Sequence, residues 1–330
     1  MYDRMKGRGM EKINWGVLGT AGIAYSQTIP GMKQAYNCNL YAIAGRKLEK
    51  AEKFKAEFGF EKAYGSYEEM LADPNVQAVY IPLPNHVHLE WIEKAAKAGK
   101  HILCEKPMGM NVDETKRALE VCRENNVILM EAFAYLHNDA IKAMVEKIKA
   151  GEIGKVSLIE SCFFTGPPAP SDFRWVKEYG GGAVYDLGCY SISLTERIMD
   201  ELPVHTQAMA HMNKTGVDDY CQIYLGFKDG AIATLGCGFV ARGRSDRMVI
   251  HGDKGSLWAD IVFNQEGKNR FEIRTDESTV EYEYDVKSNY ALEVEQLGRC
   301  ILEGEKKHIS EDFSIKVATV IEDTLRYIGY

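Results

Sequence analysis

The chain has 330 residues, a length that suits about two domains of ordinary size. Its 40 lysines and arginines against 48 acidic residues give a net charge of −8, which disfavours nucleic acid as a partner. No run reaches the roughly 18 consecutive apolar residues of a membrane-spanning helix, and the charged start lacks the apolar core of a secretion signal. We therefore expect a cytoplasmic protein that binds neither nucleic acid nor a membrane.

The histidines and cysteines do not indicate a metal site. The eight cysteines include no Cys-x-x-Cys pair and none with a histidine at zinc-ligand spacing. We interpret them as small buried side chains that stay reduced. His86 and His88 are two residues apart, which suits a strand better than a metal pair on one helix face. We predict no bound metal.

Up to about residue 134, apolar runs alternate with amphipathic helical patterns. The runs that predict strands are Ile13–Leu18, Leu40–Ala44, Val76–Ile81, His101–Cys104 and Val127–Ala132. One helix is expected from about residue 22 to residue 34, and others lie between the later strands. Strand–helix alternation at this spacing indicates a parallel, doubly wound α/β sheet.

After residue 150 the pattern changes to strand-like runs separated by turn residues. These runs are Val156–Phe164, Val204–His211, Tyr220–Phe227, Ala231–Gly238, Arg247–His251, Phe271–Arg274 and Thr279–Tyr284. Ser288–Glu303 and Asp312–Ile328 return to helical periodicity. We predict an α/β domain at 13–134 and an α+β domain with a mostly antiparallel sheet at 135–330; residues 1–12 are given no structural role.

A glycine-containing loop follows the first predicted strand and opens the first helix. It reads Gly19-Thr20-Ala21-Gly22-Ile23-Ala24. Dinucleotide fingerprints use glycines for the tight turn, for approach to the pyrophosphate and for helix–strand packing. Gly19 fills the first position, whereas Ala21 stands at the second and adds a methyl group beside the pyrophosphate path. We predict that residues 19–23 bind a dinucleotide through backbone N–H groups at the helix N-terminus.

The turn after the second strand bears on the choice of cofactor. It reads Gly45-Arg46-Lys47 and contains no acid. An acid there would bond the ribose 2′-hydroxyl of NAD, whereas arginine suits the 2′-phosphate of NADP. The alternative is a solvated helix start, although lysine is unfavourable at a helix N-terminus. We expect NADP, with NAD as the alternative.

Two further segments are candidates for the catalytic centre. Glu105-Lys106-Pro107 follows a strand at its carboxyl end, where open α/β sheets bind ligands, and Pro82–His88 should flank the same crevice. Asp186 and Tyr190 are four residues apart on a predicted helix and so share one face. A lysine beside a tyrosine favours the phenolate and supplies a proton donor and acceptor near neutral pH. Taken alone, Lys106 is better interpreted as a surface lysine at a turn.

In chain order these segments resemble the Gfo/Idh/MocA oxidoreductase family. The motifs are Gly-Thr-Ala-Gly-Ile-Ala, Pro-Asn-His-Val-His, Cys-Glu-Lys-Pro and Gly-Gly-Gly-Ala-x-x-Asp-Leu-Gly-x-Tyr. Tyr190 and Thr215–Asp219 resemble the branch with dimeric dihydrodiol dehydrogenase, NADP-dependent D-xylose dehydrogenase and glucose–fructose oxidoreductase. The resemblance implies a Rossmann domain, then a large open sheet through which a homodimer or homotetramer forms.

The resemblance also implies catalytic roles. Lys106 would lie beside the nicotinamide and the substrate hydroxyl, and Tyr190 would give or take the hydroxyl proton. Asp186 would orient the substrate or the Lys–Tyr pair. The Lys106–Pro107 bond would be cis, which is uncommon even before proline.

Further residues would contact the cofactor or the substrate. Arg46 would meet the 2′-phosphate, and the cofactor crevice would be lined by Pro82, Asn85, His88 and Glu105. Arg174 and Tyr135 would lie near the substrate. Leu136 and Asn138 stand where the family commonly has Arg and His, a departure that concerns the substrate class.

The expected reaction is hydride transfer between nicotinamide C4 and a hydroxyl-bearing carbon. The substrate would be a sugar, a sugar derivative or a trans-dihydrodiol. Two alternatives stay open: a glycosidase that holds NAD for transient oxidation, and a non-catalytic cofactor-sensing regulator. The Lys106–Tyr190 pair counts against the regulator.

Overall fold

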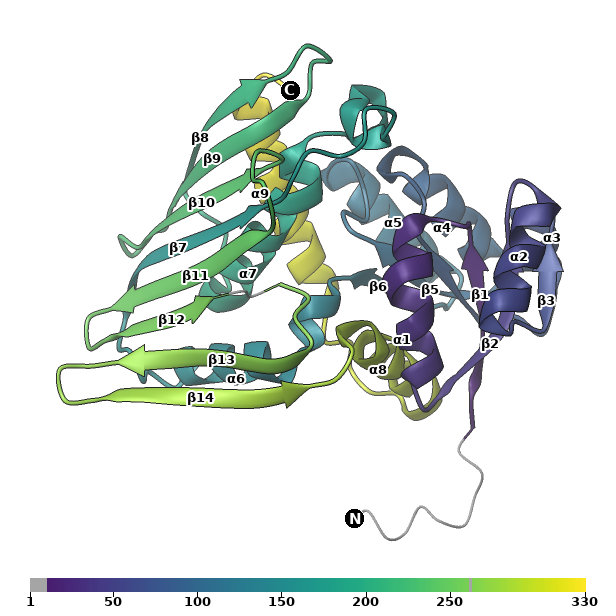
Figure 1. The fold of residues 1–330 in the computed structure, drawn as a ribbon, viewed down its shortest axis with the longest axis horizontal. Helices are drawn as coiled ribbons and strands as arrows, with labels where there is room; N and C mark the ends of the chain where they lie inside the picture. The colour runs from purple at the N-terminus through teal and green to yellow at the C-terminus, as the bar shows by residue number, and fades with distance from the viewer. Residues whose placement is uncertain (1–10, 261–262) are drawn as a thin grey trace, which may run out of the picture.

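The computed structural model describes residues 11–260 and 263–330, so residues 1–10 of the expected N-terminal extension lie outside it. The described residues form two sheets, of six and eight strands, with helices packed on both (Figure 1). The parallel α/β sheet and the mostly antiparallel second sheet are both confirmed. None of the helices in these ranges combines the length and apolar character needed to cross a bilayer.

The six-stranded sheet is parallel throughout and has the order β3-β2-β1-β4-β5-β6. Its strands are β1 (Ile13–Leu18), β2 (Cys38–Ala44), β3 (Lys62–Tyr64), β4 (Ala78–Ile81), β5 (His101–Glu105) and β6 (Leu129–Ala132). All four residues of β4 are buried, as expected of a strand covered on both faces. The strand order reverses between β1 and β4, which places a ligand crevice at their carboxyl ends.

Helices connect these strands. They are α1 (Ile29–Gln34), α2 (Leu48–Phe58), α3 (Tyr67–Ala72), α4 (His88–Lys97) and α5 (Val112–Glu124). The helix expected at residues 22–34 is confirmed, and it includes a π-helical turn, η2 (Ala24–Thr28), directly before α1. Pro30 in the first turn of α1 has no N–H group, so it cannot close a regular α-helical bond to residue 26.

The second sheet has the order β14-β13-β12-β11-β7-β10-β9-β8. Its strands are β7 (Val156–Phe164), β8 (His205–Met212), β9 (Asp218–Gly226), β10 (Ile232–Gly238), β11 (Ser245–Gly252), β12 (Ser256–Asp260), β13 (Gly267–Arg274) and β14 (Thr279–Val286). Strands β7 and β10 are parallel, and the other neighbouring pairs are antiparallel.

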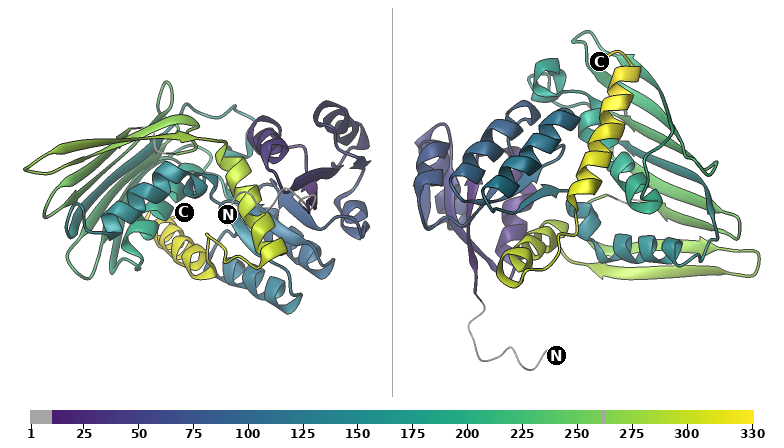
Figure 2. Two further views of the ribbon diagram at one scale, coloured as in Figure 1. Left: turned by 90° about the horizontal axis from the view of Figure 1, so that it is seen from below. Right: turned by 180° about the vertical axis from the view of Figure 1, so that it is seen from behind.

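One face of the second sheet is covered by helices α6 (Asp139–Lys149), α7 (Cys189–Met199) and α9 (Glu311–Tyr327). The opposite face carries no helix among the described residues (Figure 2).

Three elements of the structure were not predicted from the sequence: strands β3 and β12 and helix α6. Asn138 caps α6 by accepting hydrogen bonds from the N–H groups of Ala140 and Ile141, a signal that the sequence does contain.

Helix α8 (Asn289–Glu303) leaves the second sheet and packs on α1, where Gly31 permits a close approach. A Cβ atom at Gly31 would lie 2.6 Å from Tyr290 Cβ and 2.9 Å from the backbone N of Ala291. Backbone atoms cannot move aside as a flexible side chain can. We expect Gly31→Ala to lower the free energy of unfolding by about 1–3 kcal/mol, measured by urea denaturation.

Gly243→Ala is the matched control for this prediction, because nothing lies within 4 Å of a Cβ atom built there. Its unfolding curve should stay close to that of the wild type. If Gly31→Ala were equally harmless, the close contact of α1 with α8 would be contradicted.

Candidate active site

A cleft of about 500 Å³ lies where β4 and β5 end against the second half of the chain. Residues from the first half that line it include Ala21, Gly22, Ile23, Pro82, Asn85, Glu105 and Lys106. Residues from the second half include Phe163, Asp172, Arg174, Asp186, Tyr190, Asn264 and Tyr290. The structure thus gathers the three predicted catalytic residues and much of the predicted cofactor crevice in one place.

Asp186 joins two cations in this cleft. Lys106 Nζ donates to the backbone oxygen of Asp186 at 2.8 Å and to its Oδ1 at 3.2 Å. Arg174 Nε donates to Asp186 Oδ2 at 2.7 Å, and its NH1 lies 3.2 Å from Asp172 Oδ1. Burial opposes ionisation of Asp186, but Lys106 and Arg174 outweigh it and lower the pKa of Asp186 to about 2. The carboxylate is therefore ionised at neutral pH and fixes both cations.

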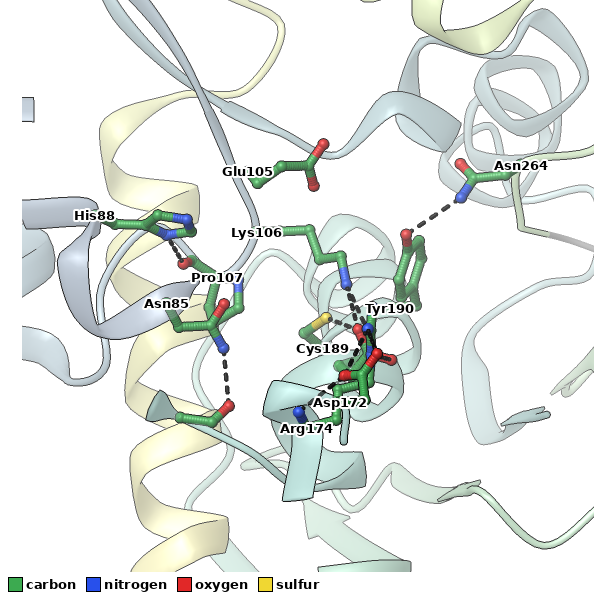
Figure 3. A network of polar contacts seen from close by, with 12 residues as sticks. Asn85, His88, Glu105, Lys106, Pro107, Asp172, Arg174, Cys189, Tyr190 and Asn264 are labelled. Atoms are coloured by element: carbon green, nitrogen blue, oxygen red, sulfur yellow. Dashed lines mark hydrogen bonds and ion pairs between the residues drawn. The ribbon is translucent and has the colours of Figure 1, made fainter. Parts of the chain in front are cut away.

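Asp186 and Tyr190 reach Lys106 from successive helical segments. Asp186 lies in a π-helical turn, η7 (Val184–Gly188), and Tyr190 follows in the first turn of α7. Lys106 Nζ is 4.8 Å from the centre of the Tyr190 ring. In Figure 3 Lys106 and Tyr190 lie side by side in the cleft. The expected shared face is therefore present, although the first part of it is π-helical.

Aromatic side chains hold the Tyr190 ring in place. Phe163 and Phe133 meet it edge to face, with ring centres 5.2 Å and 6.4 Å away. Tyr135 and Phe263 pack at 5.5 Å and 5.3 Å. A ring fixed by several aromatic neighbours keeps its hydroxyl group in one position.

Two opposing effects set the pKa of Tyr190. Lys106 does favour the phenolate, as predicted, but burial has the larger effect and raises the pKa of Tyr190 to about 12. Sequence alone does not report how deeply the hydroxyl is buried. At neutral pH Tyr190 is a neutral phenol and hence a proton donor.

The loop after β1 has the backbone shape of a phosphate-binding turn. Gly19 has a φ of +125°, and a Cβ atom there would lie 3.1 Å from Leu83 Cδ2. A side chain at this position would therefore be strained and crowded. Thr20 and Ala21 line a second cavity of about 270 Å³, which shares Ala21, Pro82, Leu83 and Pro84 with the main cleft.

Three basic residues line this second cavity, and their charge suits a phosphate group. Arg46, Lys47 and Lys50 all contribute to its wall. None of them forms an ion pair with another residue of ranges 11–260 and 263–330. Together with the loop at Gly19, these residues are suited to the phosphate groups of a dinucleotide.

Two predicted site residues lie beneath the cleft instead of lining it. His88 is fully buried; its Nδ1 is 2.9 Å from the Pro107 oxygen and its Nε2 is 2.7 Å from the Leu83 oxygen. Burial lowers the pKa of His88 to about 4. The neutral ring has a single N–H group, so it donates to only one of these two carbonyl oxygens. Tyr135 is also buried, and its hydroxyl bonds Ser193 Oγ at 2.7 Å.

The other predicted residues line the cleft and make contacts that connect its two sides. Asn85 Nδ2 donates to the Gly180 oxygen at 2.9 Å, which ties the first half of the chain to the second. Glu105 accepts a hydrogen bond from the Tyr80 hydroxyl at 2.5 Å. The Lys106–Pro107 bond is cis, as the resemblance implied.

Sequence reasoning missed several residues of the cleft. Asp172 could have been found, since it stands two residues before Arg174 and caps η5 (Phe173–Trp175). Phe163 and Tyr290 come from β7 and α8, where they look like ordinary core positions. Asn264 lies in the segment between β12 and β13 and has no motif around it.

Two family models match the chain. Residues 13–133 match "Oxidoreductase family, NAD-binding Rossmann fold", and residues 141–258 match "GFO/IDH/MocA C-terminal domain". The chain belongs to the Gfo/Idh/MocA oxidoreductase family. The resemblance seen in the motifs is therefore confirmed, as is the Rossmann fold of the first half.

Members of this family with stated activities resemble the chain over nearly its full length. The NADP(+)-dependent D-xylose 1-dehydrogenase 2 of Haloferax volcanii is 34% identical over 311 residues, 93% of this chain and 95% of that protein. The trans-1,2-dihydrobenzene-1,2-diol dehydrogenase of Xenopus laevis is 29% identical and covers 96% of this chain and 98% of its own.

A solved structure is similar as well. KijD10, a 3-ketoreductase from Actinomadura kijaniata in complex with NADP and TDP-benzene, superimposes with a TM-score of 0.89 at 26% identity. The alignment covers 96% of this chain and 98% of KijD10. The arrangement of the two halves is therefore shared with a cofactor-bound reductase.

Proposed function

We propose that this protein is an NADP-dependent dehydrogenase or reductase. It acts on a hydroxyl-bearing carbon of a sugar, a sugar derivative or a trans-dihydrodiol. The observation that carries the proposal is the meeting of Lys106, Asp186 and Tyr190 in one cleft that continues to the loop at Gly19. D-Xylose 1-dehydrogenase, dihydrodiol dehydrogenase and a 3-ketoreductase among its relatives support this substrate class.

Proton transfer is the task of Tyr190 and Lys106. The bound nicotinamide supplies or accepts the hydride. Tyr190 is protonated at neutral pH and gives its proton to the substrate oxygen during reduction; during oxidation it accepts the hydroxyl proton. Lys106 stabilises the negative charge that develops on Tyr190 or on the substrate oxygen. Asp186 acts on Lys106, because its carboxylate holds the ammonium group in place.

The walls of the cleft are partly apolar. Phe163, Tyr290, Ile23 and Leu187 all contribute to its lining. Within such a cleft the interaction of Lys106 with developing negative charge is stronger than it would be in water.

Initial rates test the proposed function. NADP⁺ reduction is measured with aldoses, inositols and trans-dihydrodiols, and NAD⁺ is run in parallel. Turnover on one class supports the proposal and names the substrate. Firm cofactor binding with no reduction of any of them would overturn it; tightly retained NAD would then point to the glycosidase alternative.

Arg46 should decide the preference for NADP. We expect Arg46→Ala to raise KM for NADP⁺ about tenfold to a hundredfold, because a charge-assisted hydrogen bond to the 2′-phosphate is lost. KM for NAD⁺ should change little. Steady-state kinetics with both cofactors measure the difference.

Lys53→Ala is the control for Arg46→Ala. Lys53 lies on α2, close in sequence to Arg46, but it is exposed and pairs with Glu49 at 2.9 Å. An equal rise in KM for both cofactors in Arg46→Ala would show that Arg46 supports the loop instead of reading the 2′-phosphate.

The proposal includes a homodimer or homotetramer formed through the second sheet. Large apolar side chains are exposed on its strands, including Met209, Tyr224, Ile232 and Val280. Analytical ultracentrifugation of the protein measures the oligomeric state; a monomer at micromolar concentration would contradict this part of the proposal.

A further inference from the structure

Asn264 contacts the hydroxyl group of Tyr190 from the second half of the chain. Its Nδ2 lies 3.2 Å from Tyr190 Oη. In Figure 3 Lys106 and Asn264 lie on opposite sides of the Tyr190 side chain. Asn264 has a φ of +52°, in the left-handed region that asparagine adopts more readily than most residues. The backbone at this position therefore suits the amide side chain that it carries.

The direction of this hydrogen bond matters for proton transfer. An amide nitrogen is only a donor, so Tyr190 Oη is the acceptor. The proton of the Tyr190 hydroxyl is then left for another acceptor in the cleft. Donation from Asn264 also stabilises the phenolate that forms when Tyr190 gives up its proton.

The other polar atom of the amide is available to a substrate. Asn264 lines the main cleft, and its Oδ1 has no hydrogen-bond partner among residues 11–260 and 263–330. An amide oxygen is an acceptor with two lone pairs. A substrate whose reacting oxygen meets Tyr190 Oη brings the next carbon, and any hydroxyl on it, toward this oxygen.

The charges in the cleft favour a neutral partner. Lys106 and Arg174 are both bonded to Asp186, and Arg174 also pairs with Asp172. Both cations are thus paired with carboxylates, and Glu105 lines the same cleft, so neither cation is left over for a phosphate group on the substrate. Neutral hydroxyl groups match the remaining polar atoms better.

We propose that Asn264 positions Tyr190 through Nδ2 and selects vicinal diols through Oδ1, which accepts a hydrogen bond from the hydroxyl next to the reacting one. In the direction of reduction, the corresponding substrate is an α-hydroxy carbonyl compound. This inference rests on the proposed function and narrows its substrate class to compounds with adjacent oxygens.

Matched substrate pairs test the inference with wild-type enzyme, Asn264→Ala and Asn264→Asp. The pairs are D-xylose and D-glucose against their 2-deoxy analogues, and trans-cyclohexane-1,2-diol against cyclohexanol. We expect the wild type to favour the diol of a pair by about tenfold to a hundredfold in kcat/KM, and Asn264→Ala to lose most of this preference.

Asn264→Asp separates the two roles of the side chain. The carboxylate of this variant still accepts a hydrogen bond from the second hydroxyl of the substrate, but it has no N–H group to donate to Tyr190. Its negative charge also disfavours the phenolate form of Tyr190. We expect this variant to keep a preference for the diol, while the rise of the oxidation rate with pH moves to higher pH. A residue with a merely structural role would change neither the preference nor the pH profile.

Unchanged diol preference in Asn264→Ala would overturn the inference, while the proposed function would stand on the wild-type turnover. If the wild type oxidises no compound of the panel, the proposed function fails separately. In that case, calorimetry measures the binding of trans-cyclohexane-1,2-diol to the NADP⁺-loaded wild type and Asn264→Ala variant. Weaker binding by the variant supports the role of Asn264, and equal binding overturns it.

Discussion

Replacing Tyr190 with phenylalanine should lower kcat by about 10²–10⁴-fold, because the reaction loses its proton donor and acceptor. The phenylalanine ring fills the same aromatic surroundings, so NADP⁺ affinity should stay close to that of the wild type. One hydrogen bond from Asn264 is lost, and the free energy of unfolding should change by less than about 1.5 kcal/mol. Steady-state rates, cofactor binding and thermal unfolding measure these three quantities.

The pH dependence gives this prediction a second readout. Burial raises the pKa of Tyr190 to about 12, so the group stays protonated from neutral to moderately alkaline pH. Reduction needs the protonated form and should not decline across this range. Oxidation needs a proton acceptor, so its rate should rise with pH in the wild type, and this dependence should disappear in Tyr190→Phe. Near wild-type kcat in the variant would exclude Tyr190 as the proton-transfer group.

Local signals in the sequence were enough to place the cofactor end of the site. Gly19 directly follows a strand and stands shortly before a helix, and only a glycine is free of strain at its φ of +125°. Lys106 follows β5, and the carboxyl ends of parallel strands share one edge of a sheet. The positions of Gly19 and Lys106 depend only on neighbouring residues and on the parallel order of the strands. The strand–helix alternation in the sequence predicts that parallel order.

Features that depend on tertiary packing were not accessible in the same way. His88 belongs to a motif of the crevice, yet its ring is fully buried between the Leu83 and Pro107 oxygens. Asn264 reaches Tyr190 from a segment 74 residues away, and no pattern in that segment indicates the contact. The pKa of Tyr190 also depends on burial by aromatic residues from several elements, which the position of Lys106 in the sequence does not reveal.

Replacing Lys106 with methionine should lower kcat by about 10²–10⁴-fold while the side chain keeps a similar length. The Lys106 ammonium opposes the effect of burial on Tyr190, so its loss raises the pKa of Tyr190 further. The rise of the oxidation rate should therefore move to still higher pH. Asp186 keeps its bond to Arg174 at 2.7 Å, and we expect the cleft to remain folded. Rate measurements across pH, together with thermal unfolding, test both statements.

Lys106→Arg is the matched variant, because it restores the positive charge beside Tyr190 but changes the position of the donor atoms. If Lys106 mainly stabilises the negative charge of the phenolate, Lys106→Arg should return the pH profile of oxidation toward that of the wild type and recover part of kcat. If Lys106 mainly positions the substrate oxygen, the pH profile should return but kcat should stay as low as in Lys106→Met. A Lys106→Met enzyme with wild-type kcat and an unshifted profile would remove Lys106 from the mechanism and leave Asn264 as the one hydrogen-bond partner of the Tyr190 hydroxyl among the described residues.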